Sequence, residues 1–343
     1  MELNCPQPHA ISESIQLGHG SGGTLTHQLL EGVVYPALGN PLLETRHDGA
    51  VMRVGASRIA FTTDSYVVKP RFFPGGDIGS LAVFGTVNDL AMCGARPLHL
   101  SVGLIIEEGL AVAELRKVVQ SIKEAAEGAS VSVVTGDTKV VDRGHGDGLY
   151  INTSGIGICE HNRVIAPSSV CPGDVILLSG DIGRHGIAVL AQREGLEFET
   201  AIESDCASLH QSTLSLLDSG IEVHCLRDLT RGGLATALKD ITESSGCGVE
   251  LCESEVPLSE AVRGACELLG LDPLYVACEG RYVVILPAEH GDQALEIMNR
   301  FPESCHAVRC GTIVEKGGVR LESVLGTKRI LDRLPGEQLP RIC

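Results

Sequence analysis

Apolar runs of strand length alternate along the whole chain with longer runs that have helical periodicity. The strand-like runs are residues 58–62, 131–135, 149–158, 175–179, 282–286 and 307–314. The helix-like runs are residues 24–38, 80–93, 112–127, 207–217, 234–244, 259–269 and 291–301. Helices and strands that are mixed throughout a chain in this way predict an α/β or α+β fold.

Three of the helix-like runs also predict burial. The run at 80–93 is nearly all apolar, so we expect a buried helix there. The run at 24–38 places one apolar stripe on a helix: Leu25, Leu29, Leu30, Val33, Val34 and Leu38. The run at 112–127 does the same with Leu115, Val118, Val119, Ile122 and Ala126. For the helix at 259–269, Ser259 is a suitable N-cap.

A length of 343 residues is enough for two domains, each with a sizeable core. A turn-rich stretch at 167–174 separates the two halves of the alternation. We therefore expect a first domain at 1–166, a second at 167–324 and a mobile tail at 325–343, where two prolines and mixed charge follow. Fully extended from residue 325, this tail would reach about 60 Å.

Charge and cysteine content exclude several classes of protein. A formal net charge of −17 argues against a protein that binds nucleic-acid phosphates. No apolar run reaches the ~18 residues of a membrane span, and no basic-then-apolar leader is visible, so we expect a cytoplasmic protein. Thirteen cysteines, an odd number without a C-x-x-C pair, predict reduced thiols rather than a disulfide framework or a common zinc site.

A glycine-rich loop, Gly18–Gly23, precedes the first predicted helix. It formally matches the dinucleotide-binding pattern G-x-G-x-x-G, but the stretch before it is too short and too polar for the strand that this pattern requires. A Walker A loop is excluded because no lysine follows the last glycine. The favoured interpretation is an anion-binding loop at a helix N-terminus. The alternative is a glycine turn that only caps the helix.

Aspartates with small or polar neighbours recur at the ends of apolar runs. They are Asp64, Asp89, Asp137 and Asp228, with Asp48 as a fifth candidate. Asp89 lies inside an apolar helix, where a charge is unfavourable unless it is paired or bound to a metal. Converging carboxylates require cations, and oxygen ligands beside phosphates indicate Mg²⁺. The alternative for any single aspartate is a helix cap or a surface acid.

A second loop that suits an anion, Thr230–Leu234, opens a helix in the second half. Its small residues leave the helix N-terminus accessible, and Arg231 has the fork geometry that binds a phosphate. The alternative is a glycine cap with an exposed arginine.

Six motifs together resemble a known ATP-binding superfamily. They are residues 19–23, 63–67, 72–79, 135–141, 228–233 and 340–343. They resemble the superfamily of aminoimidazole ribonucleotide synthetase, selenophosphate synthetase and thiamine monophosphate kinase. Within it, the resemblance is closest to the HypE family of nickel–iron hydrogenase maturation factors and covers essentially the full length. It implies an N-terminal domain that dimerises through its sheet and forms the ATP site, followed by a C-terminal α/β domain.

The resemblance also implies a reaction on the last residue of the chain, Cys343. A HypF-like carbamoyltransferase loads a carbamoyl group onto its sulfur, and ATP is used to dehydrate this group to a thiocyanate. The cyano group then passes to iron on a HypC–HypD-like scaffold. A terminal cysteine does not match a prenylation box, which places the cysteine four residues from the end.

Roles for individual residues follow from the resemblance. It implies that Mg²⁺ is bound by Asp48, Asp64, Asp89, Asp137 and Asp228, although His47 stands where the superfamily commonly has a second acid. It implies that ATP is contacted by His19, Gly20, Ser21, Gly22, Gly23, Thr63, Asn88, Gly136, Thr138, Thr230 and Arg231. Lys139 and Glu279 match positions that deprotonate the nitrogen of the carbamoyl group.

Two other functions fit the same residues. A small-molecule kinase or synthetase of this superfamily would act on a free substrate and would not need Cys343. A nucleotide-dependent scaffold would perform no chemistry and would only dock partners through its tail.

Overall fold

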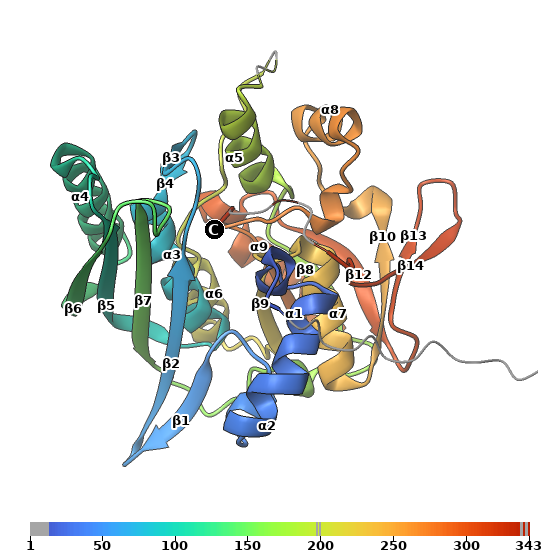
Figure 1. Cartoon of the computed structure of the whole chain (residues 1–343). Helices are drawn as coiled ribbons and strands as arrows, with labels where there is room; N and C mark the ends of the chain where they lie inside the picture. The colour runs from blue at the N-terminus through green and yellow to red at the C-terminus, as the bar shows by residue number, and fades with distance from the viewer. Residues whose placement is uncertain (1–13, 197, 199, 337–338, 340–341) are drawn as a thin grey trace, which may run out of the picture.

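The apolar run predicted at 80–93 forms helix α3 (Ile78–Met92), which is buried along nearly its whole length. The Asp77 side chain caps it by accepting hydrogen bonds from the N–H groups of Gly79 (2.7 Å) and Ser80 (3.1 Å). The helix ends before Gly94, whose positive φ of 69° stops helical geometry. Figure 1 shows α3 between the two lobes of the computed structural model, which describes residues 14–343 except 197, 199, 337, 338, 340 and 341.

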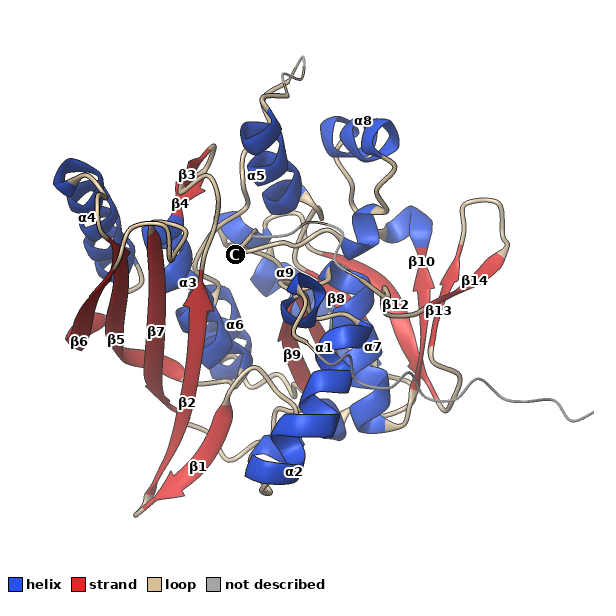
Figure 2. Ribbon diagram, viewed as in Figure 1, coloured by secondary structure: helices blue, strands red, loops and turns tan. Residues whose placement is uncertain are grey.

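The first lobe contains a five-stranded sheet in the order β1-β2-β7-β5-β6. The strands are β1 (Ala50–Val54), β2 (Ser57–Tyr66), β5 (Arg96–Glu107), β6 (Ser132–Val141) and β7 (Leu149–Ile158). Only β5 and β6 are parallel; the other neighbours are antiparallel. Helices α3 and α4 (Val112–Gly128) lie on one face of the sheet (Figure 2).

The other face of this sheet is open and carries apolar side chains. Phe61 of β2, Ile156 of β7 and Ile105 of β5 lie on it and are exposed. The register places Ile105 beside Lys139 and Gly103 beside Asp137, so both β6 side chains lie on this open face.

The second lobe contains a seven-stranded sheet in the order β14-β13-β10-β12-β8-β11-β9. Its strands are β8 (Val175–Leu178), β9 (Cys225–Asp228), β10 (Gly248–Cys252), β11 (Tyr282–Leu286), β12 (Val308–Val314), β13 (Val319–Glu322) and β14 (Lys328–Leu331). Its helices are α5 (Arg184–Glu194), α6 (His210–Asp218), α7 (Gly233–Ser245), α8 (Glu260–Leu269) and α9 (Gly291–Met298). The α/β class predicted from the alternation is therefore confirmed.

The continuous apolar runs of the central strands are explained by helices on both faces. Ile176 and Leu178 of β8 pack in a cluster with α7, whereas Val175 and Leu177 pack in a second cluster with α6 and α9. Ala91 and Met92, at the end of α3, belong to this second cluster. One helix thus contributes to the cores of both lobes.

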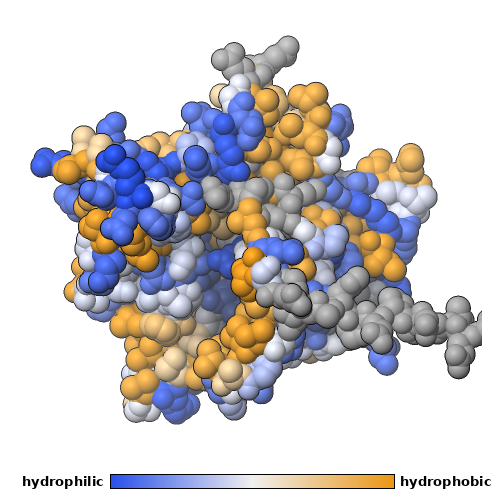
Figure 3. Space-filling view, viewed as in Figure 1, coloured by the Kyte–Doolittle hydropathy of each residue, from blue (hydrophilic) through white to orange (hydrophobic). Residues whose placement is uncertain are grey.

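The helix expected over 24–38 forms, but it is not a regular α-helix along its whole length. Helix α1 (Thr24–Leu29) is followed by a π-turn at Leu30–Val34 and a short α2 (Tyr35–Leu38). Pro36 has no N–H to donate to the carbonyl of residue 32, so a regular α-helix cannot continue through it. None of the predicted apolar stripe is buried, and hydrophobic residues are visible over this segment in Figure 3.

Two smaller expectations are also corrected. Val119 of α4 is 46% exposed, whereas Val118, Ile122 and Ala126 of the predicted stripe are buried. The tail predicted to be mobile from residue 325 begins with β14, which pairs with β13 and buries Leu331 in the core of the second lobe. By contrast, Ser259 caps α8 as expected, accepting the N–H of Val262 at 3.3 Å.

Within the described part of the chain, no helix combines the length and the apolar character that a membrane span needs.

Replacing a buried leucine of α3 tests its structural role. We expect Leu81→Ala to lower the free energy of unfolding by about 2–5 kcal/mol, because the fully buried side chain leaves a cavity. Leu268→Ala on α8 is a matched control, since Leu268 is 75% exposed, and it should change stability by less than about 0.5 kcal/mol. Urea unfolding measures both, and equal losses would contradict a core role for α3.

Candidate functional site

Three of the predicted aspartates converge where the two lobes meet. Asp48 precedes β1, Asp89 lies on α3 and Asp228 ends β9. Each offers a carboxylate oxygen, and these oxygens lie within 4.8 Å of one another. Asp64 of β2 lines the same recess, which is hydrophilic in the space-filling view (Figure 3). We call Asp48, Asp64, Asp89 and Asp228 the aspartate cluster.

Burial and mutual repulsion raise the pKa values of Asp48, Asp89 and Asp228. Burial, followed by the charges of the other three members, raises the pKa of Asp89 well above its usual range. Burial also raises the pKa of Asp48 to about 6 and that of Asp228 to about 7. Carboxylates in this arrangement cannot all be ionised near neutral pH unless a cation joins them.

Nearby donors satisfy only part of the cluster. Thr62 donates its hydroxyl to Asp89 Oδ2 at 2.7 Å, and Thr230 donates to Asp228 Oδ1 at 3.1 Å. Arg227 Nε lies 3.0 Å from Asp48 Oδ1, but Asp48 Oδ2 is buried without a hydrogen-bond partner. An unpartnered buried oxygen among oxygen donors fits a hard divalent cation such as Mg²⁺.

His47 adjoins the cluster without a charge. Its Nε2–H donates to the carbonyl of Met92 at 3.1 Å, and its Nδ1 lies 3.6 Å from Asp48 Oδ2. Burial lowers the pKa of this imidazole to about 3, so it stays neutral. His47 therefore cannot offset the carboxylate charges.

Four predicted site residues on β6 do not join the cluster within one chain. They are Gly136, Asp137, Thr138 and Lys139. Strand β6 lies three positions from β2 in the sheet, which corresponds to about 14 Å at ~4.8 Å per strand. Moreover, Asp137 and Lys139 point to the open face, opposite the face that carries α3 and Asp89.

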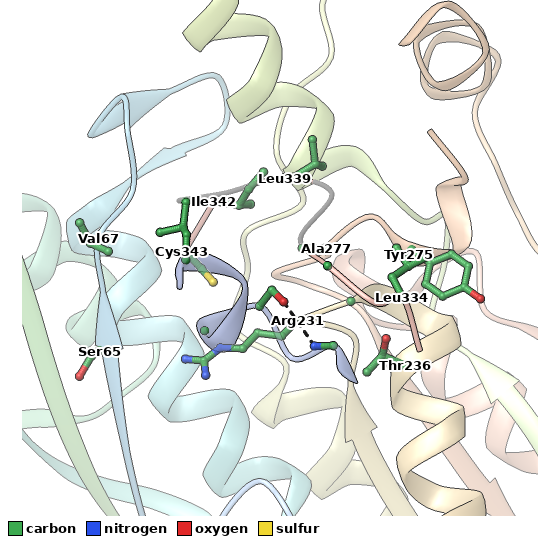
Figure 4. Close-up of a pocket in the computed structure, with 16 residues that line it drawn as sticks. Ser65, Val67, Arg231, Thr236, Tyr275, Ala277, Leu334, Leu339, Ile342 and Cys343 are labelled. Atoms are coloured by element: carbon green, nitrogen blue, oxygen red, sulfur yellow. Dashed lines mark hydrogen bonds between the residues drawn. The ribbon is translucent and has the colours of Figure 1, made fainter. Parts of the chain in front are cut away.

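The glycine loop contacts the C-terminal segment of the same chain. The N–H of Thr24 donates to the carbonyl of Leu334 at 3.0 Å, and the N–H of Gly22 donates to Thr26 Oγ1 at 2.9 Å. The N–H of Gly23 reaches Ser21 Oγ at 3.4 Å, which is the dashed line of Figure 4. In this structure these donors are used within the chain rather than left free for an anion.

Close packing explains two of the loop glycines. Gly22 has a φ of +79°, and a Cβ atom there would lie 2.8 Å from Cβ of Arg231. A Cβ atom at Gly23 would lie 2.7 Å from the carbonyl oxygen of Leu334. His19 of this loop is buried, and its Nδ1 accepts the N–H of Gln16 at 2.9 Å.

The C-terminal segment is anchored before it reaches the loop. Lys239 of α7 pairs with Asp332 at 3.1 Å, and Arg333 pairs with Glu243 at 2.7 Å and with Asp240. Asp240 also pairs with His27 of α1 and with Arg227, each at 3.4 Å. The base of the tail, the first helix and the cluster therefore share one ion-pair network.

The last residue of the chain, Cys343, lies in a pocket of about 300 Å³ between the lobes (Figure 4). Ser65 of β2, Val67 just after this strand, the glycine loop and Arg231 line this pocket, and the Cys343 sulfur points toward Arg231. Pro340 and Arg341 of the terminal motif lie outside the described residues.

Arg231 links this sulfur to the aspartate cluster. Burial, followed by the carboxylate of Glu279, raises the pKa of the Cys343 thiol to about 12, and Arg231 partly opposes that rise. Arg231 Nη2 also pairs with Asp64 Oδ1 at 3.0 Å. The structure thus brings Arg231, Glu279 and Cys343 together beside the cluster.

Glu279 is buried, and its Oε1 has no hydrogen-bond partner. Burial and the charges of Asp228 and Asp64 raise the pKa of this carboxyl group well above its usual range. The next residue must be glycine, because a Cβ atom at Gly280 would lie 1.7 Å from the Asp205 carbonyl oxygen. A buried carboxyl group with a raised pKa is thereby held near the sulfur.

Two predicted nucleotide-binding residues have structural partners here. Asn88 donates to the carbonyl of Ala207 at 3.0 Å and accepts the N–H of Leu209 at 2.8 Å. Thr63 donates its hydroxyl to the carbonyl of Thr153 at 3.0 Å on the open face of the sheet. Both residues hold neighbouring elements in place in this structure.

Arg227, Asp240 and His185 lie at the site but are not among the residues predicted for it. A charged residue inside an apolar strand, as at Arg227, is a signal that marks a buried ion pair. Asp240 faces it from α7 and gives no such signal, because helices commonly carry acids. His185, on α5, contacts the tail through the carbonyl of Ile342, which is too distant in sequence for a local pattern to mark it.

Both lobes match one family of proteins. Residues 46–159 match the N-terminal domain of AIR synthase related proteins, and residues 171–324 match their C-terminal domain. The AIR synthase-like fold implied by the sequence resemblance is confirmed by these matches.

Full-length relatives are more specific. The chain is 48% identical over 332 residues to "Carbamoyl dehydratase HypE" of Azotobacter vinelandii, covering 96% of this chain and 97% of that protein. A crystal structure of hydrogenase maturation protein HypE in complex with ATP is 46% identical, with a TM-score of 0.82 over 96% of this chain and all of that one. A crystal structure of a HypE–HypF complex gives a TM-score of 0.86 at 44% identity, covering 89% of this chain and 99% of that one.

Identity at this level over nearly the full length, together with both domain matches, shows the family. The chain belongs to the HypE family of carbamoyl dehydratases, within the AIR synthase-related proteins.

Proposed function

We propose that this chain uses ATP to dehydrate an S-carbamoyl group on Cys343 to a thiocyanate, the source of the cyanide ligands of nickel–iron hydrogenases. The observation that carries this proposal is the position of the Cys343 sulfur, which lies in a pocket with Arg231 and beside Glu279. The carbamoyl dehydratases and the ATP-bound HypE structure to which the chain is similar support the same reaction.

The chemistry is a dehydration in which the oxygen leaves on phosphate. An amide oxygen is a poor leaving group, and the γ-phosphoryl group of ATP converts it to phosphate. Loss of both N–H protons then completes the C≡N bond, so the products are thiocyanate, ADP and phosphate. Such a transfer needs positioning and charge neutralisation more than covalent help from the protein.

The residues of the site have separate roles in this proposal. The aspartate cluster holds Mg²⁺, which when bound neutralises phosphate charge. Arg231 orients the tail and offsets negative charge near the sulfur. In its ionised form Glu279 accepts a proton from the carbamoyl nitrogen, because its raised pKa makes that form a stronger base than an exposed carboxylate.

We also propose that the protein works as a homodimer. The open face of the first sheet exposes Phe61, Ile105 and Ile156, and apolar faces of this kind commonly mark an interface. A second copy on this face would meet Asp137 and Lys139, which point to it. In this proposal residues 136–139 act in the ATP site across the interface, with Lys139 as the second candidate base.

Partners and compartment follow from the family. Since a HypE–HypF complex is known for a similar protein, we propose that a HypF-like carbamoyltransferase loads Cys343. A HypC–HypD-like scaffold would receive the cyano group, and all of these steps would take place in the cytoplasm. The glycine loop, His19 to Gly23, with Thr63, Asn88 and Thr230, would form the walls of the nucleotide site.

Intact-mass measurement tests the reaction directly. When carbamoylated protein is given ATP and Mg²⁺, we expect the chain to lose the mass of one water, and Cys343→Ala to show neither carbamoylation nor loss. An unchanged mass together with turnover of a free substrate would favour the alternative function as a small-molecule kinase or synthetase. An unchanged mass with ATP-dependent partner binding would favour the alternative in which this chain is a nucleotide-dependent scaffold without catalytic activity.

Asp89→Asn tests the metal site. We expect dehydration to slow by at least ~100-fold, because one ligand and one charge of the cluster are lost, while carbamoylation of Cys343 continues. Asp292→Asn, at an exposed position on α9, is the matched control and should leave the rate unchanged. Normal dehydration by Asp89→Asn would show that the metal assignment is wrong.

An apolar-to-charged substitution tests the dimer. We expect Ile105→Asp to shift the protein from dimer to monomer in light scattering and to reduce dehydration, because it buries a charge in the proposed interface. Ile330→Asp is the control, since Ile330 is an exposed isoleucine on a strand of the other lobe. A monomeric wild type with full activity would exclude a role for the second copy.

A further inference from the structure

A buried histidine of the second lobe holds the end of the tail. His185 is the second residue of α5 and is fully buried. Its Nε2 lies 3.0 Å from the carbonyl oxygen of Ile342, the residue before Cys343. Its Nδ1 lies 2.8 Å from Ser204 Oγ. Nothing in the proposed chemistry uses this side chain directly.

The hydrogen bonds fix the tautomer of the ring. A carbonyl oxygen can only accept, so the proton of a neutral imidazole is on Nε2. Nδ1 then accepts the hydroxyl proton of Ser204, whose oxygen in turn accepts the N–H of Cys206 at 3.0 Å. Burial lowers the pKa of His185, which keeps the ring neutral. The donor and the acceptor of each hydrogen bond in this series are therefore fixed.

The first lobe supports this arrangement through the hairpin of β3 (Phe72–Phe73) and β4 (Gly76–Asp77). The ring of Phe73 meets His185 edge-on, with centroids 5.3 Å apart. The carbonyl of Pro74 accepts the N–H of Ser204 at 2.8 Å. Gly75 has a φ of +86°, and a Cβ atom there would lie 2.7 Å from the Ser204 backbone. The motif at 72–79 thus packs against His185 and Ser204 and supports their positions.

The bond to Ile342 sets where the sulfur lies. The Ile342 side chain is buried, and a buried carbonyl needs a partner to avoid a desolvation penalty. A slip of the tail by one residue would move the sulfur about 3.3 Å and present a different carbonyl to His185. The hydrogen bond therefore favours one register of the tail.

We propose that His185, oriented by Ser204, is a positioning residue that holds the tail in the register that places the Cys343 sulfur beside Arg231 and Glu279. It acts through the Ile342 carbonyl and does not touch the reacting atoms. This proposal rests on the proposed function in one respect only, namely that Cys343 carries the group that reacts.

The first test measures protection of Cys343 in the full chain without ATP or partner. His185→Phe keeps the ring that packs on Phe73 but has no donor, whereas His185→Gln retains a donor near the position of Nε2. Iodoacetamide labelling is followed by mass spectrometry of residues 338–343, released by cleavage after Glu337. Because the seated thiol is only partly exposed and its pKa is raised, labelling proceeds mainly through tails that have left the pocket.

We expect iodoacetamide to label Cys343 about tenfold faster in His185→Phe than in the wild type. This corresponds to a loss of about 1.4 kcal/mol in the free energy that holds the tail in the pocket. His185→Gln should lie between the two. Ser204→Ala, which leaves His185 and its packing in place, should also raise labelling. His306→Phe, at an exposed histidine, is the control and should label like the wild type. Thermal unfolding identifies variants that have lost the fold.

The second test measures single-turnover dehydration of carbamoylated protein. We expect His185→Phe to slow it about tenfold at saturating ATP without changing the ATP concentration for half-maximal rate, and His185→Gln to recover part of the loss. Loading of the carbamoyl group should not slow, since it needs the tail outside the pocket.

Equal labelling of Cys343 in the wild type and in folded His185→Phe would overturn the positioning role. Rescue by His185→Gln in both assays would support it, because a purely structural loss would not depend on the donor. If the wild type never loses water but the labelling difference is present, the proposed function fails and the anchoring of the tail by His185 stands.

Discussion

Asp48, Asp89 and Asp228 bring carboxylate oxygens within 4.8 Å of one another at the junction of the two lobes. The electrostatic repulsion among these carboxylates determines which groups lie around them. Arg227 faces Asp48, hydroxyl groups face Asp89 and Asp228, and Arg231 faces Asp64. Because the members come from the loop before β1, from α3 and from β9, the cluster exists only when both lobes are docked. The buried helix α3, which packs in both cores, supplies that docking.

The tail is held at its base and at its end, and its contacts reach different parts of the molecule. Arg333 pairs with Asp240 and Glu243 of α7, Leu334 accepts the N–H that opens α1, and Ile342 accepts from His185. The first contact belongs to the ion-pair network at the base of the tail. A swinging arm would therefore start after Arg333 rather than at residue 325. Ten residues extend at most about 33 Å, half the reach predicted from the sequence.

The sequence predicted the regular core well because its signals are local. The apolar runs of α3 and β11 report burial directly, and an aspartate inside an apolar helix reports a metal or an ion pair. Prediction failed where the answer depends on distant residues. Pro36 interrupts the regular α-helical hydrogen bonding of 24–38, and none of the apolar stripe there is buried. The N–H of Thr24 is used by Leu334, 310 positions away. Asp137 shares the sequence context of Asp89, but strand order and register separate the two. His185 and Ile342 are 157 positions apart, so no local pattern identifies their contact.

Charge gives the pocket a preference for one form of the tail. Outside the pocket, a cysteine thiol has a pKa near 8.5, and its thiolate is the nucleophile that a carbamoyl donor needs. Inside, burial and Glu279 raise that pKa to about 12, so the thiolate is disfavoured. By linkage, the pocket binds the neutral thiol more tightly than the thiolate, so seating of the unmodified tail weakens as the pH rises above about 8.5. An S-carbamoyl group has no such proton to lose and enters without this penalty. On the proposed function, the pocket therefore accepts the carbamoylated tail and disfavours the tail that carries an ionised thiol. Carbamoyl loading would then take place with the tail outside the pocket, and dehydration with the tail inside it.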